Sequence, residues 1–156
     1  PSRLVGSEMC IRDRDNGGGV MKISGGCYCQ NIRYEISSVP ETAFQCHCRE
    51  CQYITGGNPN IVMVFPKDSF SYSSGNVTTF SRKDLETPVT RHFCDKCGTA
   101  IGTESPSRPN SMIVKVGTLD DPSTFEAKAA IFTCDLQSYH YLPSGLPSFE
   151  KRPPKK

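Results

Sequence analysis

The chain has 156 residues, which fits one domain, because domains most often hold roughly 100 to 150 residues. Hydrophobic residues make up 36% of it and the formal net charge is +2, so the sequence predicts a small core and no strong field for nucleic acid. No apolar run approaches the roughly 20 residues that span a bilayer, and we expect neither a nucleic-acid nor a membrane partner.

Residues 1–20 lack helical and strand periodicity and end in a glycine run. They are typical of a flexible leader, and we expect this leader to be extraneous, with the domain running from Met21 to Pro153. A natural disordered extension is the alternative. Residues 154–156 form a short basic tail.

Nine cysteines occur in the chain, and seven of them lie in close clusters. Neighbouring thiols are poorly placed to bridge one another and well placed to share a metal ion. The clusters therefore favour zinc over a disulfide scaffold and predict a reducing, cytoplasmic setting.

The first pair, Cys27 and Cys29, leads into residues 32–36, where apolar and polar side chains alternate. Alternation with a period of two predicts a half-buried strand, which would anchor the pair to a sheet. After a turn at Pro40, residues 43–45 bring the chain to the second cluster.

The second cluster places Cys46, Cys48 and Cys51 within six residues. One short loop can point three such side chains at a single ion, and thiolate sulfur suits Zn²⁺. Three protein ligands with an open fourth position is the usual arrangement of catalytic zinc. An iron–sulfur cluster is disfavoured, because the spacing matches neither common ferredoxin pattern. The structural alternative is a closed site, completed by Cys134, His47, His92 or His140.

The middle of the chain predicts further strands. Residues 61–65 form a short apolar run rich in β-branched side chains, which indicates a central strand. Residues 66–70 could form one helical turn with proline near its start. Residues 71–73 and 77–80 flank a Ser-Gly-Asn turn and predict a hairpin.

The third cluster, Cys94 and Cys97, lies between predicted strands at residues 89–93 and 99–103. Gly98 suits a zinc knuckle, because the backbone turns sharply there and amide N–H groups can face the thiolates. Together with the first pair, these cysteines form a natural closed tetrahedral site. Strands are also expected at residues 111–117 and 127–132, with a turn or short helix over 120–125 and no regular structure from residue 133.

In order and spacing, residues 25–29, 46–51 and 91–99 resemble the glutathione-dependent formaldehyde-activating enzyme family, also called the centromere protein V family. The resemblance runs from about Met21 to about Pro153. It implies a mainly β, Mss4-like fold, with small twisted antiparallel sheets built around a pair of zinc knuckles. It also implies two Zn²⁺ per chain: a structural zinc on Cys27, Cys29, Cys94 and Cys97, and an active-centre zinc on Cys46, Cys48 and Cys51.

The activity that this resemblance implies is carbon–sulfur lyase or S-hydroxymethylglutathione synthase chemistry. Its partners would be a small thiol such as glutathione and an aldehyde such as formaldehyde. The alternative from another class is a non-catalytic zinc module that binds a protein. Neither the pattern nor the resemblance predicts an oligomeric state.

Several other side chains near the second cluster are candidates. Glu50 could act as an acid–base group and Arg49 could pair with a substrate carboxylate, although both also fit a solvated loop. His47 stands between two predicted ligands and is expected to point away from the metal, at the surface or behind a ligand. Residues 55–57 could supply N–H donors to a small ligand or form a plain turn.

Overall fold

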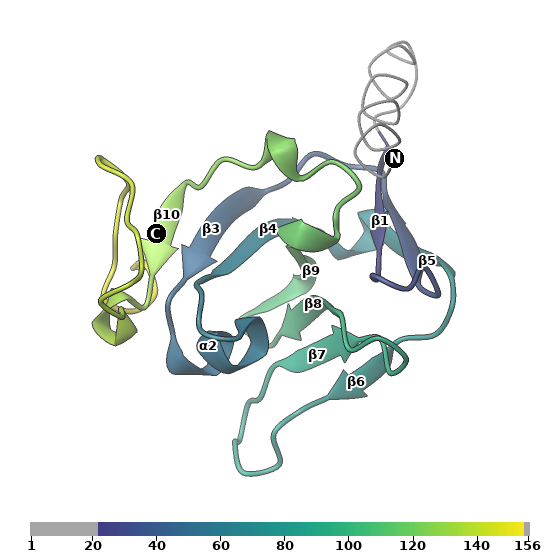
Figure 1. The fold of residues 1–156 in the computed structure, drawn as a ribbon, viewed down its shortest axis with the longest axis horizontal. Coiled ribbons are helices and arrows are strands. Elements are labelled where there is room, and N and C mark those ends of the chain that lie inside the picture. The colour runs from purple at the N-terminus through teal and green to yellow at the C-terminus, as the bar shows by residue number, and fades with distance from the viewer. Residues whose placement is uncertain (1–21, 155–156) are drawn as a thin grey trace.

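The computed structural model describes residues 22–154, in which two β-sheets pack on one another (Figure 1). The smaller sheet has the order β1-β2-β5, with β1 at Ile23–Gly26, β2 at Arg33–Ile36 and β5 at Phe70–Ser74. The larger, seven-stranded sheet has the order β10-β3-β4-β9-β8-β7-β6. Its strands are β3 Thr42–Cys46, β4 Asn60–Pro66, β6 Thr78–Phe80, β7 Thr90–Phe93, β8 Ala100–Ser105, β9 Arg108–Lys115 and β10 Ala129–Ile131.

Short helical segments connect these strands. The α-helix α2 spans Arg49–Thr55, and 3-10 turns occupy Lys67–Ser69, Val116–Thr118, Pro122–Thr124 and Thr133–Asp135. Among residues 22–154, no helix has the length and apolar character needed to cross a membrane.

The core lies between the two sheets. Tyr34 and Ile36 from β2 pack with Met63 and Phe65 from β4 and Val114 from β9. Successive side chains of a strand point to opposite faces, so the intervening residues of β3, β4 and β9 face the other side of the large sheet. That second face carries the site described below.

The mainly β class and most of the expected strands are confirmed, including β2, β4, β7, β8 and β9. The helical turn after Pro66 and the short helix after Asp121 are also present. One strand pair departs from the antiparallel expectation, because β10 runs parallel to β3.

The predicted hairpin over residues 71–80 is wrong. Strand β5 pairs with β2 and β6 pairs with β7, so the two segments belong to different sheets. Gly75 between them has a φ of 75°, and a Cβ there would lie 2.2 Å from the carbonyl oxygen of Asn31. The Ser-Gly-Asn segment thus carries the chain closely past the β1–β2 turn and on to the larger sheet.

Helix α2 was not predicted, because seven residues are too few to establish a helical period. Its N-cap is Cys48, whose sulfur accepts the amide N–H of Cys51 at 3.3 Å. The helix ends at Gly56, which adopts a left-handed conformation with a φ of 79°. The second cysteine cluster therefore lies at a helix N-terminus rather than in an irregular loop.

The segment after β10 does have order, although it holds little regular structure. It returns along β10, where Ala130 donates to the Pro147 carbonyl oxygen at 2.9 Å and accepts from the Phe149 amide at 2.9 Å. In Figure 1 this yellow segment lies at the outer edge of the large sheet, beside β10.

Strand β1 was also not predicted, and Gly25 explains how it fits. A Cβ at Gly25 would lie 2.3 Å from both the Thr118 carbonyl oxygen and the Tyr34 hydroxyl, which is far inside contact distance. Gly25→Ala should therefore lower the free energy of unfolding by about 1–3 kcal/mol, as overpacking does. Gly117→Ala is the matched control, because nothing lies within 4 Å of a Cβ there. Equal thermal midpoints for the two variants would contradict this packing.

Candidate metal centres

Four thiols meet where the β1–β2 turn approaches the β7–β8 turn. The sulfurs of Cys27, Cys29, Cys94 and Cys97 all lie within 4.8 Å of one another. The Cys27–Cys29 and Cys29–Cys94 sulfur distances are 3.6 and 3.8 Å. Four sulfurs at about 2.3 Å from a tetrahedral zinc would lie about 3.8 Å apart. The cluster therefore has the dimensions of a four-thiolate zinc site.

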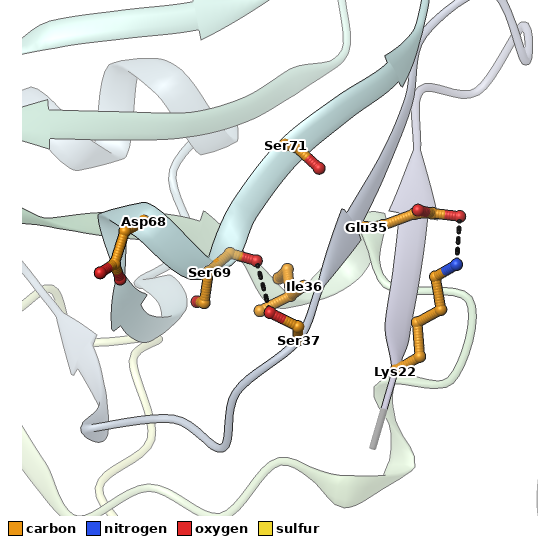
Figure 2. Close-up of a pocket in the computed structure, with 7 residues that line it drawn as sticks. All are labelled: Lys22, Glu35, Ile36, Ser37, Asp68, Ser69 and Ser71. Atoms are coloured by element: carbon orange, nitrogen blue, oxygen red, sulfur yellow. Dashed lines mark hydrogen bonds and ion pairs between the residues drawn. The ribbon is translucent and has the colours of Figure 1, made fainter. Parts of the chain in front are cut away.

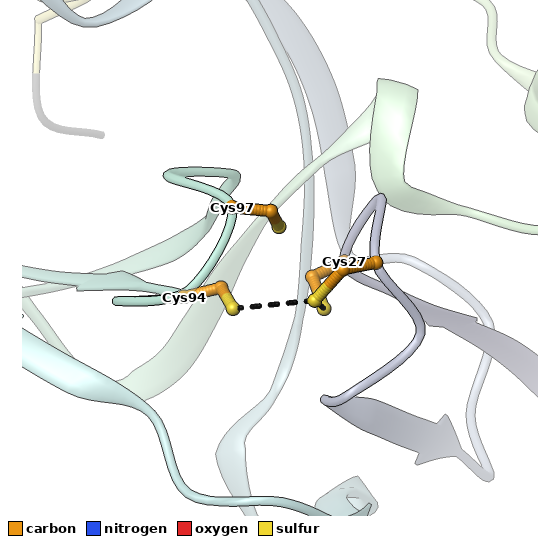
Figure 3. Close-up of side chains that lie close together, drawn as sticks. Cys27, Cys94 and Cys97 are labelled. Carbon is orange, nitrogen blue, oxygen red and sulfur yellow. Dashed lines mark hydrogen bonds between the residues drawn. The ribbon is translucent and has the colours of Figure 1, made fainter.

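Both turns have the geometry of a zinc knuckle. The Gln30 amide donates to the Cys27 carbonyl oxygen at 3.1 Å, and the Gly98 amide donates to that of Cys94 at 2.8 Å. Gln30 and Gly98 have φ values of 68° and 76°, so each turn reverses through a left-handed residue. In Figure 3, Cys94 and Cys97 point from one turn toward Cys27 on the other.

Hydrogen bonds to sulfur favour the ionised forms of Cys27 and Cys97. The Ile32 amide donates to the Cys27 sulfur at 3.2 Å, and the Thr99 hydroxyl lies 3.1 Å from the Cys97 sulfur. The contacts with Thr99 lower the pKa of Cys97 to about 5. Thiolates are the form that binds metal.

Three further thiols meet at the end of β3. Cys46 closes that strand, Cys48 caps α2, and Cys51 lies in its first turn, with the three sulfur atoms within 4.8 Å of one another. Contacts with the other two thiols lower the pKa of Cys51 to about 2 and raise the pKa of Cys46. Three adjacent thiols can all ionise only when a cation offsets their charge. The donor set fits a soft divalent ion such as Zn²⁺.

The alternative fourth ligands lie outside both clusters. Among residues 22–154, the two groups of metal-binding side chains contain only the seven cysteines named above. Cys134 is exposed and free. His92 lies between the Tyr72 hydroxyl, 2.7 Å from its Nδ1, and the Glu104 carboxylate, 2.9 Å from its Nε2. Its role is to join β5 of one sheet to β7 and β8 of the other.

His47 is not at the surface, because its side chain is fully buried. The side-chain nitrogen of Gln45 donates to the Tyr141 carbonyl oxygen at 3.2 Å, and this contact identifies it as the NH₂ group of the amide. The same NH₂ group lies 2.9 Å from His47 Nε2, so it donates there and Nε2 accepts. His47 Nδ1 must then carry the proton that it shares with His140 Nδ1 at 2.9 Å. This pair ties the cysteine loop to the C-terminal segment, and sequence spacing gave no sign of it.

The Gly56-Gly57 turn offers no free N–H donors to a ligand. At the C-terminal end of α2, the backbone N–H groups of Gly56 and Gly57 both donate to the carbonyl oxygen of Gln52. The distance from the Gly57 nitrogen is 2.7 Å. The carbonyl oxygen of Gly57 accepts from His140 Nε2 at 2.7 Å. The plain-turn interpretation of these glycines is therefore correct.

A groove of about 670 Å³ crosses the outer face of the large sheet and reaches the three-thiol cluster. Its wall includes Cys46, Cys48 and Cys51, so the thiols are accessible from it. The strands supply an apolar floor, formed by Phe44, Val62, Ile113, Ala129 and Ile131. A groove of this size suits a small molecule, since ligand pockets usually measure about 300–1,000 Å³.

Charged side chains line the rim of this groove. Glu50 pairs with Arg91 at 2.7 Å, and both face the groove. Arg49 contacts Gln52 and lies over the Tyr53 ring at 5.1 Å. Two exposed guanidinium groups, those of Arg108 and Arg152, complete a largely basic rim. The rim therefore favours an anionic ligand.

A lysine is buried beneath the three-thiol cluster. Lys115 is 8% exposed, and its ammonium donates to Asn60 Oδ1 at 2.6 Å. Asn60 Nδ2 in turn donates to the sulfur of Cys51 at 3.5 Å. Burial lowers the pKa of Lys115 to about 8, although the neighbouring Cys51 favours the charged form. Sequence analysis did not identify either residue, because each stands in an ordinary strand.

Another hollow, of about 350 Å³, lies beside the small sheet (Figure 2). None of the described residues that line it is a cysteine. Its charged groups include the Lys22–Glu35 ion pair at 3.0 Å, and the rest of its wall is mainly serine side chains. Among the residues that the structure describes, its wall contains no cysteine or histidine and no set of metal ligands, so the thiol-lined groove is the candidate site.

Comparison with known proteins points to one family. Residues 22–135 match the family model described as glutathione-dependent formaldehyde-activating enzyme. A Halomonas elongata protein named "Putative glutathione-dependent formaldehyde-activating enzyme" is 24% identical over 94 residues. That alignment covers 57% of this chain and 60% of the relative, which is less than two thirds of the relative's length.

A solved structure resembles this chain in fold. The crystal structure of a Rhodobacter sphaeroides protein superposes with a TM-score of 0.52 and 20% sequence identity. The superposition covers 61% of this chain and 85% of that one.

The two clusters should respond differently to loss of one thiol. Bound zinc contributes about 10–16 kcal/mol in zinc-finger peptides, whereas whole domains are stable by only about 5–15 kcal/mol. Cys97→Ser should therefore give unfolded or insoluble protein. Cys48→Ser should stay folded with one zinc, because serine is itself a good N-cap for α2.

Far-UV circular dichroism and bound-zinc analysis of both variants test this difference. Cys134→Ser is the control and should keep both zincs, because Cys134 lies outside the clusters. If Cys48→Ser unfolds as fully as Cys97→Ser, the three-thiol cluster is structural as well.

Proposed function

The chain belongs to the glutathione-dependent formaldehyde-activating enzyme family, and we propose that it is a zinc-dependent carbon–sulfur lyase. Its substrate would be a small thiol adduct such as S-hydroxymethylglutathione, which forms from glutathione and formaldehyde. The observation that carries the proposal is the groove that opens onto Cys46, Cys48 and Cys51. A purely structural metal cluster has no need of a ligand-sized groove against its sulfurs.

We assign one zinc to each cluster. Cys27, Cys29, Cys94 and Cys97 would hold a structural zinc with four protein ligands. The other three thiolates would hold a zinc with a fourth position that faces the groove. Bound there, zinc would lower the pKa of a substrate thiol and hold the thiolate in place.

The groove would bind and orient the rest of the substrate. Its basic rim would attract the carboxylates of a thiol such as glutathione. Arg49, Arg108 and Arg152 are the rim residues that could pair with those carboxylates. Binding of the thiol portion would then place its sulfur against the cysteine cluster.

Glu50 would move the proton in this reaction. It precedes Cys51 in α2 and lines the groove, with Arg91 fixing its carboxylate. In adduct breakdown, Glu50 would take the hydroxyl proton as the C=O bond of the aldehyde forms. The carbon–sulfur bond breaks, and its electron pair leaves with sulfur as thiolate. In the reverse direction, Glu50 would return the proton to the oxygen.

The reaction requires reduced sulfur throughout. The eight cysteines among the described residues are all free thiols, and we propose a reducing, cytoplasmic setting for the protein. The small thiol and the aldehyde would be its partners.

Turnover of glutathione with formaldehyde, followed by NMR of the adduct, tests the proposal. The zinc-loaded protein should accelerate formation and breakdown of S-hydroxymethylglutathione. Two bound zincs with no turnover on any small thiol adduct would instead favour a protein-binding zinc module.

A carboxylate substitution tests the role of Glu50. Glu50→Gln should lower kcat by about 10²- to 10⁴-fold, the usual contribution of a general base, while both zincs remain bound. Glu126→Gln removes an exposed carboxylate that pairs with Lys128 and should leave kcat unchanged. A Glu50→Gln variant with undiminished kcat would exclude Glu50 from proton transfer.

A further inference from the structure

Lys115 stands out among the buried residues because it is a cation without a carboxylate partner. Within residues 22–154 no Asp or Glu forms an ion pair with it, and its ammonium donates to the neutral Asn60 side chain. A buried charge is costly unless something nearby compensates it. The compensating charge must therefore come from another kind of group.

The three-thiol cluster supplies that charge. Cys51, Cys46 and Cys48 all favour the charged form of Lys115 through their negative charge. Three thiolates around one Zn²⁺ leave a net charge of about −1. The other nearby cation, Arg91, is already paired with Glu50 at 2.7 Å. Lys115 is thus a buried positive charge beside the cluster that has no carboxylate partner in the described part of the chain.

Strand register places Lys115 where it can act on the cluster through one intermediate. Asn60 pairs across the strands with Cys46, and Lys115 pairs with Val62, two residues farther along β4. All of these side chains lie on the groove face, because alternate residues of a strand share a face. Strands β4 and β9 both lie inside the seven-stranded sheet, so each is hydrogen-bonded to a neighbour on both sides.

The Asn60 side chain connects the two groups with a defined polarity. Its Oδ1 accepts from the Lys115 ammonium at 2.6 Å, so its Nδ2 must face the other way, toward the Cys51 sulfur at 3.5 Å. Without a donor at Oδ1, the amide could turn over and present oxygen to a thiolate. Lys115 therefore fixes which atom of Asn60 meets the sulfur.

We propose that Lys115, acting through Asn60, is a positioning residue that sets the charge and sulfur basicity of the Cys46/Cys48/Cys51 metal centre. Its charge offsets the excess negative charge of the three thiolates, and its hydrogen bond keeps an N–H donor on Cys51. Both effects withdraw electron density from sulfur and leave the metal a better acceptor for a fourth ligand. The inference rests on the proposed metal at this cluster, and it predicts a property of the metal centre rather than of the fold.

Cobalt substitution measures this property directly, because Co²⁺ bound to thiolates shows sulfur-to-metal charge-transfer absorption. The wild-type protein should bind two equivalents of Co²⁺, and subtraction of the Cys48→Ser spectrum isolates the band of the three-thiol centre. If wild-type protein binds only one equivalent, the proposed metal centre is wrong, whatever Lys115 does.

With two equivalents bound, Lys115→Met should weaken Co²⁺ binding at the three-thiol centre by about 10- to 100-fold, the usual effect of losing an outer hydrogen-bond partner. Its charge-transfer band should move to longer wavelength, because more electron-rich sulfur gives up an electron more easily. Lys115→Arg keeps the charge and should restore both affinity and band. The four-thiol centre should be unaffected in each variant.

Lys128→Met is the matched control, because it removes a lysine that is 61% exposed and pairs with Glu126. It should leave both centres unchanged. A Lys115→Met protein with wild-type affinity and an unmoved band would overturn the proposal, even if its thermal midpoint falls.

Asn60→Asp keeps the proposal testable should Lys115→Met fail to fold. Aspartate has the shape of asparagine and retains the contact with Lys115, but it replaces the N–H donor facing Cys51 with oxygen. It should weaken Co²⁺ binding at the three-thiol centre and shift its band to longer wavelength. Wild-type affinity and spectrum in Asn60→Asp would show that neither Asn60 nor Lys115 tunes the metal.

Discussion

The close approach of thiol groups in two clusters is the constraint on which the rest of the structure depends. Seven sulfurs lie within 4.8 Å of their cluster neighbours, and such groups can ionise together only around a cation. In the first cluster, Cys27 and Cys94 are also members of the core between the sheets. A metal there would tie the β1–β2 turn to the β7–β8 turn and compensate for a core that is small for the length of the chain.

The two faces of the large sheet have different roles, because one packs in the core and the other carries the candidate site. One face packs on the small sheet, with Met63 and Val114 in the core, while the other carries the groove and the end of β3 with Cys46. Helix α2 brings Cys48 and Cys51 over that end, and the His47–His140 contact holds the C-terminal segment behind them. An exchangeable metal position could therefore be used without disturbing the core.

Much of this arrangement could be predicted from local patterns in the sequence. Alternation identified β2, the apolar run identified β4, and spacing separated the cysteines into the two sets that the structure brings together. Patterns failed where distant segments decide the outcome. The pattern around Gly75 predicted a hairpin turn, but the backbone there packs closely against Asn31 and connects two different sheets. Helix α2 is too short to show a helical period in the sequence. The Lys115–Asn60 contact depends on strand register, and His47 meets a residue 93 positions away, so neither has a local signal.

The central claim is that the four-thiol cluster is a closed zinc site and the three-thiol cluster keeps an open zinc position. X-ray absorption at the zinc edge tests this claim most directly. With both centres loaded and no thiol added, the account predicts an average of about 3.5 sulfur ligands per zinc and a remaining light-atom ligand. Saturating glutathione should raise that average to about four sulfurs as its thiolate takes the open position. Four sulfurs per zinc before any thiol is added, or an average that glutathione leaves unchanged, would contradict the account.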